Sequence, residues 1–218
     1  MQRILAAFFV SILTNAAQAE PPKVDDSRFQ FDPKDMVHIK EGINWVDIDG
    51  DGLDNFIVKA YRNNSSAHTQ TIYTFNRKCN HNNKYDACVR NNYETVGFYH
   101  DFNSHIFIEN YIASMFIYGY HSDIRLIKPP HGKPFVIIGS AIGGESLADP
   151  NFVEFRKYIL EVSEKDNMYN VPPGFKEQDG VYLSKGHYTD VGEAFLFELG
   201  LPDPEPHLHS YFEPNRKR

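Results

Sequence analysis

The pattern with the most chemical content is a run of acidic residues at positions 47–55. Aspartate stands at every second position and glycine follows the third of them, as Asp47, Asp49, Asp51 and Gly52. Such alternation directs successive carboxylates toward one point, and Ca²⁺ takes about six to eight oxygen ligands from groups of this kind. Crowded carboxylates also repel one another unless a cation neutralises them. The spacing therefore predicts the first half of a calcium-binding loop.

The rest of the ligand set is expected just after the glycine. The Leu53 carbonyl would supply one oxygen, and the side chain of Asp54 or Asn55 would complete the set. Val58 occupies the twelfth position of the loop, where an EF-hand carries glutamate, so the loop is not a standard EF-hand. The amide of Asn55 carries no charge, so we expect modest affinity. The alternative is an Asp/Gly turn between two strands that holds no ion.

The two cysteines, Cys79 and Cys88, form an even count in a chain expected to be exported, which predicts one disulfide closing a short loop. Cross-linking a loop of this length is worth about 2–3 kcal/mol in the chain-entropy account. A metal site with His81 is the alternative, and its spacing is poor for zinc. In the last segment, His207 and His209 are too few to define a metal site.

The sequence lacks the patterns that common exported hydrolases require. It contains no Gly-x-Ser-x-Gly, no Ser-x-x-Lys and no His-Glu-x-x-His. A serine nucleophile of the known β-lactam-hydrolysing type and a helical zinc pair are therefore not indicated. We expect a protein that is not an enzyme.

The N-terminal segment has the three parts of a secretory signal peptide: Arg3, the apolar run 4–13 and the small-x-small site 17–19. We expect cleavage before Glu20 and a periplasmic or secreted mature protein. The apolar run is shorter than the roughly 20 residues that span a bilayer, and no later segment is apolar enough. The net charge of −7 argues against a nucleic-acid partner.

Beyond the signal peptide, short apolar runs bounded by Gly, Pro, Asn or Asp predict a mainly β protein. The expected strands cover 36–40, 43–47, 55–62, 69–76, 105–109, 114–118, 124–127 and 134–140. A further strand is expected over 152–164, where the spacing of the apolar residues also permits a helix. Asp190 or Thr189 is expected to begin one short helix that ends at Leu199, before Gly200. Regular spacing of the strands favours a single antiparallel β-sandwich-like domain. The expected organisation is signal peptide 1–19, extended leader 20–34, single β-rich domain 35–201 and disordered tail 202–218.

One stretch resembles a known family. Gly42-Ile43-Asn44, the acidic loop, Ile57-Val58, Tyr61-Arg62-Asn63, Ser66-Ala67-His68 and Thr74-Phe75 occur in this order. That order resembles the CarG-type carbapenem intrinsic-resistance proteins, which are periplasmic, over roughly residues 42–76. The resemblance implies tolerance to β-lactams without hydrolysis.

The resemblance implies that Arg62 and His68 are the functional candidates. A guanidinium can pair with a carboxylate, either that of a carbapenem β-lactam or that of a periplasmic partner protein. The alternative role for both residues is a structural hydrogen-bond pair that braces the loop 63–67.

Two other function classes remain open from the sequence. A calcium-stabilised extracytoplasmic binding or adhesion module would fit the acidic loop equally well, and it should display an exposed aromatic patch. An uncharacterised exported hydrolase is the second, and it should turn over a substrate.

Overall fold

The computed structural model describes residues 29–64, 68–78, 92–101, 106–109, 112–115, 122–142, 149–161 and 174–203. Within these residues the elements, in chain order, are η2 (Pro33–Asp35), β1 (Met36–Val37), β2 (Gly42–Trp45), β3 (Phe56–Asn64), β4 (His68–Lys78), β5 (Tyr93–Asp101), β6 (Ile106–Glu109), β7 (Ile112–Met115), β8 (Ser122–Ile127), β9 (Phe135–Ile142), β10 (Phe152–Glu161), β11 (Gly174–Leu183) and α1 (Val191–Leu199). The predicted mainly β protein with one short C-terminal helix is confirmed.

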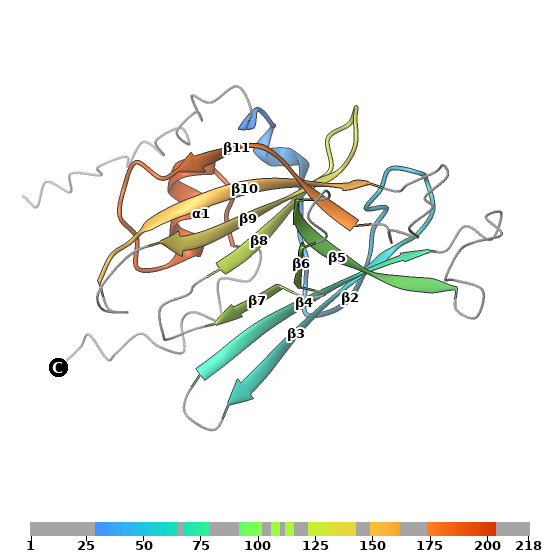
Figure 1. Cartoon of the computed structure of the whole chain (residues 1–218), viewed down its shortest axis with the longest axis horizontal. Helices are drawn as coiled ribbons and strands as arrows, with labels where there is room; N and C mark the ends of the chain where they lie inside the picture. Colours follow the sequence, from blue (N-terminus) through green and yellow to red (C-terminus); the bar gives the residue numbers. More distant parts are fainter. Residues whose placement is uncertain are drawn as a thin grey trace, which may run out of the picture.

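The strands form one 11-stranded mixed sheet in the order β1-β8-β9-β10-β11-β5-β4-β3-β2, with β6 paired to β5 and β7 to β4 (Figure 1). Neighbours pair antiparallel except for β11 and β5, which run parallel. The expected antiparallel sandwich is therefore replaced by a continuous sheet. A parallel pair joins its two halves, where a sandwich would have two separate sheets.

The sheet curls because its two edges are tied together by the chain. β1 and β2 are the opposite edge strands, and only residues 38–41 lie between them. Five Cα–Cα steps reach at most about 18 Å, so Val37 and Gly42 cannot lie at the far ends of a flat sheet. The result is a half-barrel. Across its inside, strands that are distant in the sheet order face one another.

The core divides between the two faces of this sheet. Alternate residues of β9 point to opposite sides: Phe135 and Ile137 belong to the cluster under α1, whereas Val136 belongs to the inner cluster. The inner cluster joins side chains of β3, β4, β5, β8, β9, β10 and β11, including Ile57, Phe75, Val96, Leu126, Val136, Leu160 and Phe175. Contacts between strands from both ends of the order are what hold the curl.

Helix α1 has the signals that the sequence predicted. The Asp190 side chain accepts a hydrogen bond from the Gly192 N–H at 2.5 Å, and Gly200 ends the helix with φ 69°. Its buried side chains, Phe195 among them, pack on the outer side of β8–β10. Phe29, in the expected leader 20–34, is buried in the same cluster. None of the helices among the described residues is both long enough and apolar enough to cross a membrane.

Candidate functional site

The acidic loop lies where the sequence places it, in the connection from β2 to β3. The two strands pair antiparallel with Trp45 opposite Phe56, and the Val46 N–H donates to the Asn55 carbonyl at 3.0 Å. Gly50 and Gly52 have φ of 79° and 81°, in the left-handed region that favours glycine. These two glycines let the chain turn tightly enough to bring alternate aspartates together.

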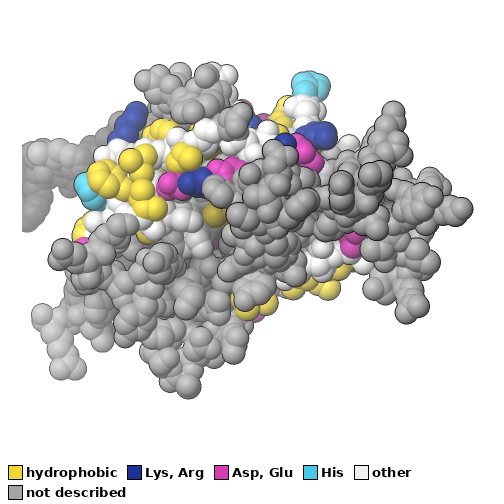
Figure 2. Space-filling view, in the orientation of Figure 1, with side chains coloured by type: hydrophobic (Ala, Val, Ile, Leu, Met, Phe, Trp, Pro, Cys, Tyr) yellow, Lys and Arg dark blue, Asp and Glu magenta, His cyan; other side chains and the backbone are white. Residues whose placement is uncertain are grey.

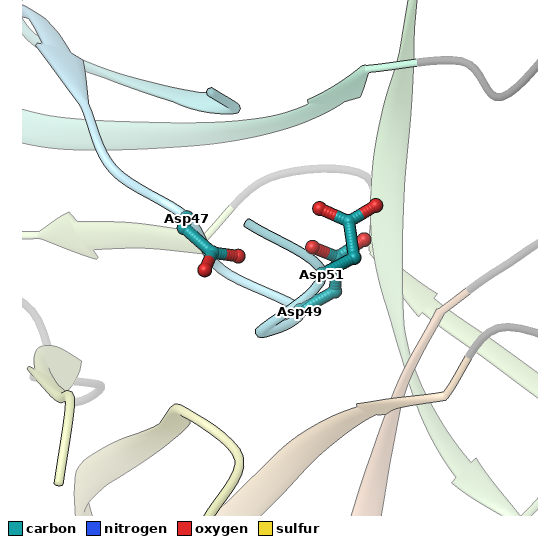
Figure 3. Close-up of side chains that lie close together, drawn as sticks. All are labelled: Asp47, Asp49 and Asp51. Carbon is teal, nitrogen blue, oxygen red and sulfur yellow. The ribbon is translucent and has the colours of Figure 1, made fainter. Parts of the chain in front are cut away.

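Three of the predicted ligands do come together (Figure 3). Asp47, Asp49 and Asp51 each offer a carboxylate oxygen, and these oxygens lie within 4.8 Å of one another. Asp54 does not belong to this group, and the Leu53 side chain is exposed. The group of three is called the aspartate triad below. The triad is a set of hard oxygen donors that could hold a metal ion.

The loop's own backbone orients two of these carboxylates. Asp47 accepts from the Gly50 N–H at 2.7 Å and from the Gly52 N–H at 3.2 Å. Asp51 accepts from the Leu53 N–H at 2.8 Å. Each is a local hydrogen bond of the type that Asp commonly makes in turns. The carboxylates of Asp47 and Asp51 are therefore oriented by local geometry, before any ion is considered.

The third carboxylate, Asp49, is held from outside the loop. Arg77 on β4 donates from Nε to Asp49 Oδ2 at 2.8 Å and from Nη1 to Glu94 Oε1 at 3.0 Å. The side chains of Arg77 and Asp49 are only 8% and 5% exposed, so this is a buried ion pair. Sequence analysis missed Arg77, because 28 residues separate it from Asp49 and only the strand pairing brings them together.

Asn55 is one of the two residues predicted to complete the ligand set, and the protein itself engages both ends of its side-chain amide. Its side chain is fully buried, its Nδ2 donates to Asp49 Oδ1 at 3.0 Å, and its Oδ1 accepts from the Lys78 N–H at 2.6 Å. The amide oxygen that was expected to ligate a cation is thus bound to the backbone of β4. Asn55 fastens the end of the loop to the neighbouring strand.

A cation at the triad fits the donor chemistry but needs further ligands. Both Asp49 oxygens accept hydrogen bonds, and Lys128 Nζ lies 3.6 Å from Asp47 Oδ2 at an exposed position. Arg77 and Lys128 offset only part of the negative charge of the loop and Glu94. Three carboxylates fall short of the roughly six to eight oxygens of a calcium site, so backbone carbonyls or water must supply the remainder.

The other candidates from the sequence are only partly placed. Arg62 and His68 belong to β3 and β4, where Arg62 pairs with Gln70 and Asn64 with His68. Their backbones therefore meet at the same hairpin, while their side chains lie outside the described part of the structure. Cys79 and Cys88 also lie outside the described residues, so the disulfide stays a prediction.

Beside the acidic loop, the strands that flank it present an aromatic surface. Trp45 and Phe56 stand at the two ends of the loop, and their rings meet at 5.3 Å. Tyr93 of β5 contacts both rings, with centroids 6.1 Å from Trp45 and 5.0 Å from Phe56. Trp45 is 60% exposed. These three rings are called the aromatic platform below.

A second surface lies on the other half of the sheet. Figure 2 shows hydrophobic side chains grouped over the region of β9–β11, beside acidic and basic ones. The exposed apolar residues of these strands are Ile142, Val181 and Leu183. Nearby, Arg156 pairs with Glu154 and with Glu177. Burial and Glu177 raise the pKa of Tyr158 in this network.

Comparison with known families covers most of the β-rich part. The family model described as carbapenem resistance protein CarG-like matches residues 39–196, well over half of the chain. The chain belongs to the CarG-like family. The match extends far past the stretch 42–76 and includes the acidic loop, β5, β11 and most of α1. The resemblance seen in the sequence is confirmed.

A solved CarG-like structure supports the same fold. The protein described as "Crystal structure of CarG" aligns with a TM-score of 0.57 and 21% sequence identity, covering 73% of this chain and 92% of that one. At this identity the likeness concerns the fold alone. No curated protein sequence matches the chain.

Proposed function

We propose that this CarG-like protein is exported and gives its host tolerance to carbapenem β-lactams without hydrolysing them. The observation that carries the proposal is the family-model match over residues 39–196. The absence of the usual hydrolase patterns from the sequence supports the non-hydrolytic part. The signal-peptide pattern at 1–19 supports export.

The test measures tolerance and drug decay in the same culture. A susceptible Gram-negative bacterium that expresses the full chain should survive a raised carbapenem concentration while the drug's absorbance in the medium stays constant. The export control is a variant that lacks residues 2–19, which should accumulate inside the cell and give no tolerance. Rapid loss of absorbance with purified protein would contradict the non-hydrolytic proposal. Unchanged survival at good periplasmic expression would contradict the tolerance.

Export and the disulfide have a mass-spectrometric test of their own. Periplasmic protein should begin at Glu20, and alkylation without reduction should label neither Cys79 nor Cys88. A species that retains residues 1–19, or quantitative labelling of both thiols, would contradict the respective proposal. Both measurements use the protein recovered from the tolerance experiment.

Arg62 and His68 remain the proposed contacts to a carboxylate of the drug or of a partner protein. Their meeting at one hairpin, where Arg62 pairs with Gln70 and His68 with Asn64, supports a shared role. Arg62→Gln and His68→Gln should lower tolerance at unchanged melting temperature. A fall in melting temperature together with tolerance would instead indicate the structural role.

Calcium is the proposed occupant of the aspartate triad. The support is the closeness of Asp47, Asp49 and Asp51 and the negative charge that Arg77 and Lys128 leave uncompensated. Bound Ca²⁺ would brace the β2–β3 connection. Its thermal test is given in the Discussion.

A calcium-stabilised binding module is the second candidate function, and one observation favours it. Such a module should display exposed aromatic side chains, and Trp45 of the aromatic platform is 60% exposed. Trp45 and Phe56 also lie at the two ends of the acidic loop, so a cation there would steady the hairpin that carries them. A protein that gives no tolerance but retains a ligand on this surface would place this function first.

A further inference from the structure

The aromatic platform is a rigid group in which one large ring faces solvent. Phe56 lies edge-on to both Trp45 and Tyr93, with interplanar angles of 60° and 67°, and the third pair meets at 61°. Edge-to-face contacts of this kind stabilise each ring's orientation. Trp45 nevertheless stays 60% exposed, and Ile43, two residues earlier on β2, is 62% exposed. The platform therefore presents the indole in a fixed position.

The sheet continues the platform with neutral polar side chains. Residues paired directly across antiparallel strands project on the same face. The register Trp45–Phe56–Asn76–Thr95 thus forms one row from β2 to β5, in which two aromatic residues are followed by an amide and a hydroxyl. The Thr95 hydroxyl donates to Asn76 Oδ1 at 3.1 Å. None of the four side chains in this row is ionisable.

The next row on the same face has a similar character. It runs Ile43–Val58–Thr74 and also contains no ionisable side chain. Charged side chains border the two rows: Lys78 stands opposite Tyr93, and the acidic loop connects Trp45 to Phe56. Seven side chains in two rows are few for a stable protein interface, which buries about 800 Å² on each partner. The size and the neutrality favour a small, uncharged, amphipathic ligand over a second protein.

We propose that this face binds the sugar rings of a neutral glycan. A pyranose ring has an apolar C–H face, which would lie on the Trp45 indole, and a rim of hydroxyls, which would reach Asn76 and Thr95. Across three strand spacings of about 4.8 Å each, the row is as wide as a short oligosaccharide. The proposal deepens the binding-module function and does not depend on carbapenem tolerance.

The test uses the fact that Trp45 is the only tryptophan in the sequence. The mature chain is titrated with chitotetraose, cellotetraose and maltotetraose, and the tryptophan emission is recorded. Binding should shift the emission to shorter wavelength, saturate, and protect the indole from quenching by acrylamide. At least one of the three should do so at millimolar concentration or below.

Variants are compared by calorimetry, because Trp45→Ala removes the fluorophore. Trp45→Ala should weaken binding about tenfold or more, the loss expected for one aromatic contact, and Trp45→Phe should retain part of the affinity. Leu183→Ala is the matched control: Leu183 is 48% exposed on the other half of the sheet, so its loss should leave binding unchanged. Melting temperatures of all variants are measured alongside.

Three outcomes would overturn the proposal. The first is no saturable binding of any of the three sugars by folded protein. The second is equal binding by Trp45→Ala and wild type. The third is a dimer that dissociates in Trp45→Ala, which would assign the face to a second copy of the chain. Carbapenem survival of cells that express Trp45→Ala is scored separately, so failure of the tolerance proposal and failure of glycan binding give different results.

Discussion

Arg77 Nε lies 2.8 Å from Asp49 Oδ2, and this buried contact fastens the acidic loop to β4. The same guanidinium reaches Glu94 on β5 at 3.0 Å, so one side chain connects the loop to two strands. Burying an arginine and two carboxylates is costly unless all remain paired. The loop is consequently tied to the sheet by the guanidinium of Arg77. A bound metal ion would neutralise the negative charge of the loop carboxylates that Arg77 leaves unpaired.

Replacing Arg77 with glutamine should destabilise the protein by about 3–5 kcal/mol, because Asp49 and Glu94 would lose the buried cation that pairs with both of them. The urea midpoint of unfolding measures this. Lys128→Gln is the control. Lys128 Nζ lies 3.6 Å from Asp47 Oδ2 and the lysine side chain is 44% exposed, so this substitution should lower the free energy of unfolding by less than about 1 kcal/mol. Equal midpoints for the two variants would contradict a dominant role for Arg77.

Calcium should raise the melting temperature and a chelator should lower it, with Mg²⁺ much less effective. With an affinity of about 10⁻⁴ to 10⁻³ M, 10 mM Ca²⁺ would add about 1.4–2.7 kcal/mol, which corresponds to a shift of a few degrees to about 10 °C. Differential scanning fluorimetry in Ca²⁺ and in EGTA records the shift. A melting temperature indifferent to both would reduce the triad to a hydrogen-bonded turn.

The residue that tests the calcium site most cleanly is Asp51. It is exposed, so Asp51→Asn should change the stability of the metal-free protein by no more than about 0.5 kcal/mol while removing the calcium response. Asp54→Asn is the matched control, because Asp54 is exposed in the same loop and lies outside the triad. Asp49→Ala should also remove the response, but it breaks the Arg77 pair and so lowers stability by itself. A calcium response retained by Asp51→Asn would contradict the site.

Local patterns account for the parts of the site that sequence analysis predicted. The alternation of Asp47, Asp49 and Asp51 is an i, i+2 relationship, and the glycines that turn the chain stand between and after them. The role of Arg77 has no local signal, because it depends on which strand pairs with β3. Asn55 or Asp54 was expected to complete the ligand set because of its position, and the hydrogen bond from the Lys78 N–H to Asn55 had no signal in the sequence. Contacts between distant strands are therefore what the sequence pattern cannot reveal.

The same distinction explains the fold. β9 and β10 carry apolar side chains in patterns that identify them as strands, and both were predicted. β5 and β11 were missed, since Gly97 and Gly180 interrupt them and charged residues replace an apolar alternation in β11. They are central strands that pair parallel to each other, and each has a hydrogen-bonded neighbouring strand on both sides. These strand pairings, and not a local apolar pattern, hold them in the sheet. Because this pair was missed, the sequence analysis expected an antiparallel sandwich-like arrangement where the structure has a curled mixed sheet.

Gly139→Ala should destabilise the contact between β9 and α1. A Cβ at this position would lie 2.8 Å from Phe195 Cε2, 2.9 Å from Val191 Cγ1 and 3.1 Å from Phe155 Cε1. Overpacking of a core of this kind costs about 1–3 kcal/mol. Urea unfolding measures the loss, and Ser140→Ala, on the next residue and the opposite face of β9, should leave stability nearly unchanged. A Gly139→Ala protein as stable as wild type would show that α1 can shift outward at little cost.

Glu198 joins α1 to β11 and to the segment that follows it. Its carboxylate accepts hydrogen bonds from the Tyr182 hydroxyl at 2.9 Å and the Tyr188 hydroxyl at 2.7 Å. It also accepts from the Lys185 and Gly186 N–H groups, each at 2.9 Å. Burial alone would raise the pKa of Glu198, but these hydrogen bonds to the charged form outweigh it and lower the pKa below 4.5. Burial and the contact with Glu198 raise the pKa of Tyr188 to about 12.

The lowered pKa makes Glu198 a source of acid sensitivity. The unfolded chain binds a proton at this residue more readily than the folded one. The contribution of Glu198 to the free energy of unfolding is therefore complete above the ordinary pKa of 4.5 and is lost as the pH falls through the lower folded value.

Glu198→Gln should keep most of the hydrogen bonds, because the amide oxygen can accept while its NH₂ donates to a tyrosine hydroxyl. We expect this variant to lose about 1 kcal/mol at neutral pH and to lose less additional stability on acidification than wild type. Glu198→Ala, which removes the acceptor that four donors share, should cost more, about 3 kcal/mol or above. Urea midpoints between pH 7 and pH 3 check both expectations. Parallel pH profiles of wild type and Glu198→Gln would show that other carboxylates control the acid sensitivity.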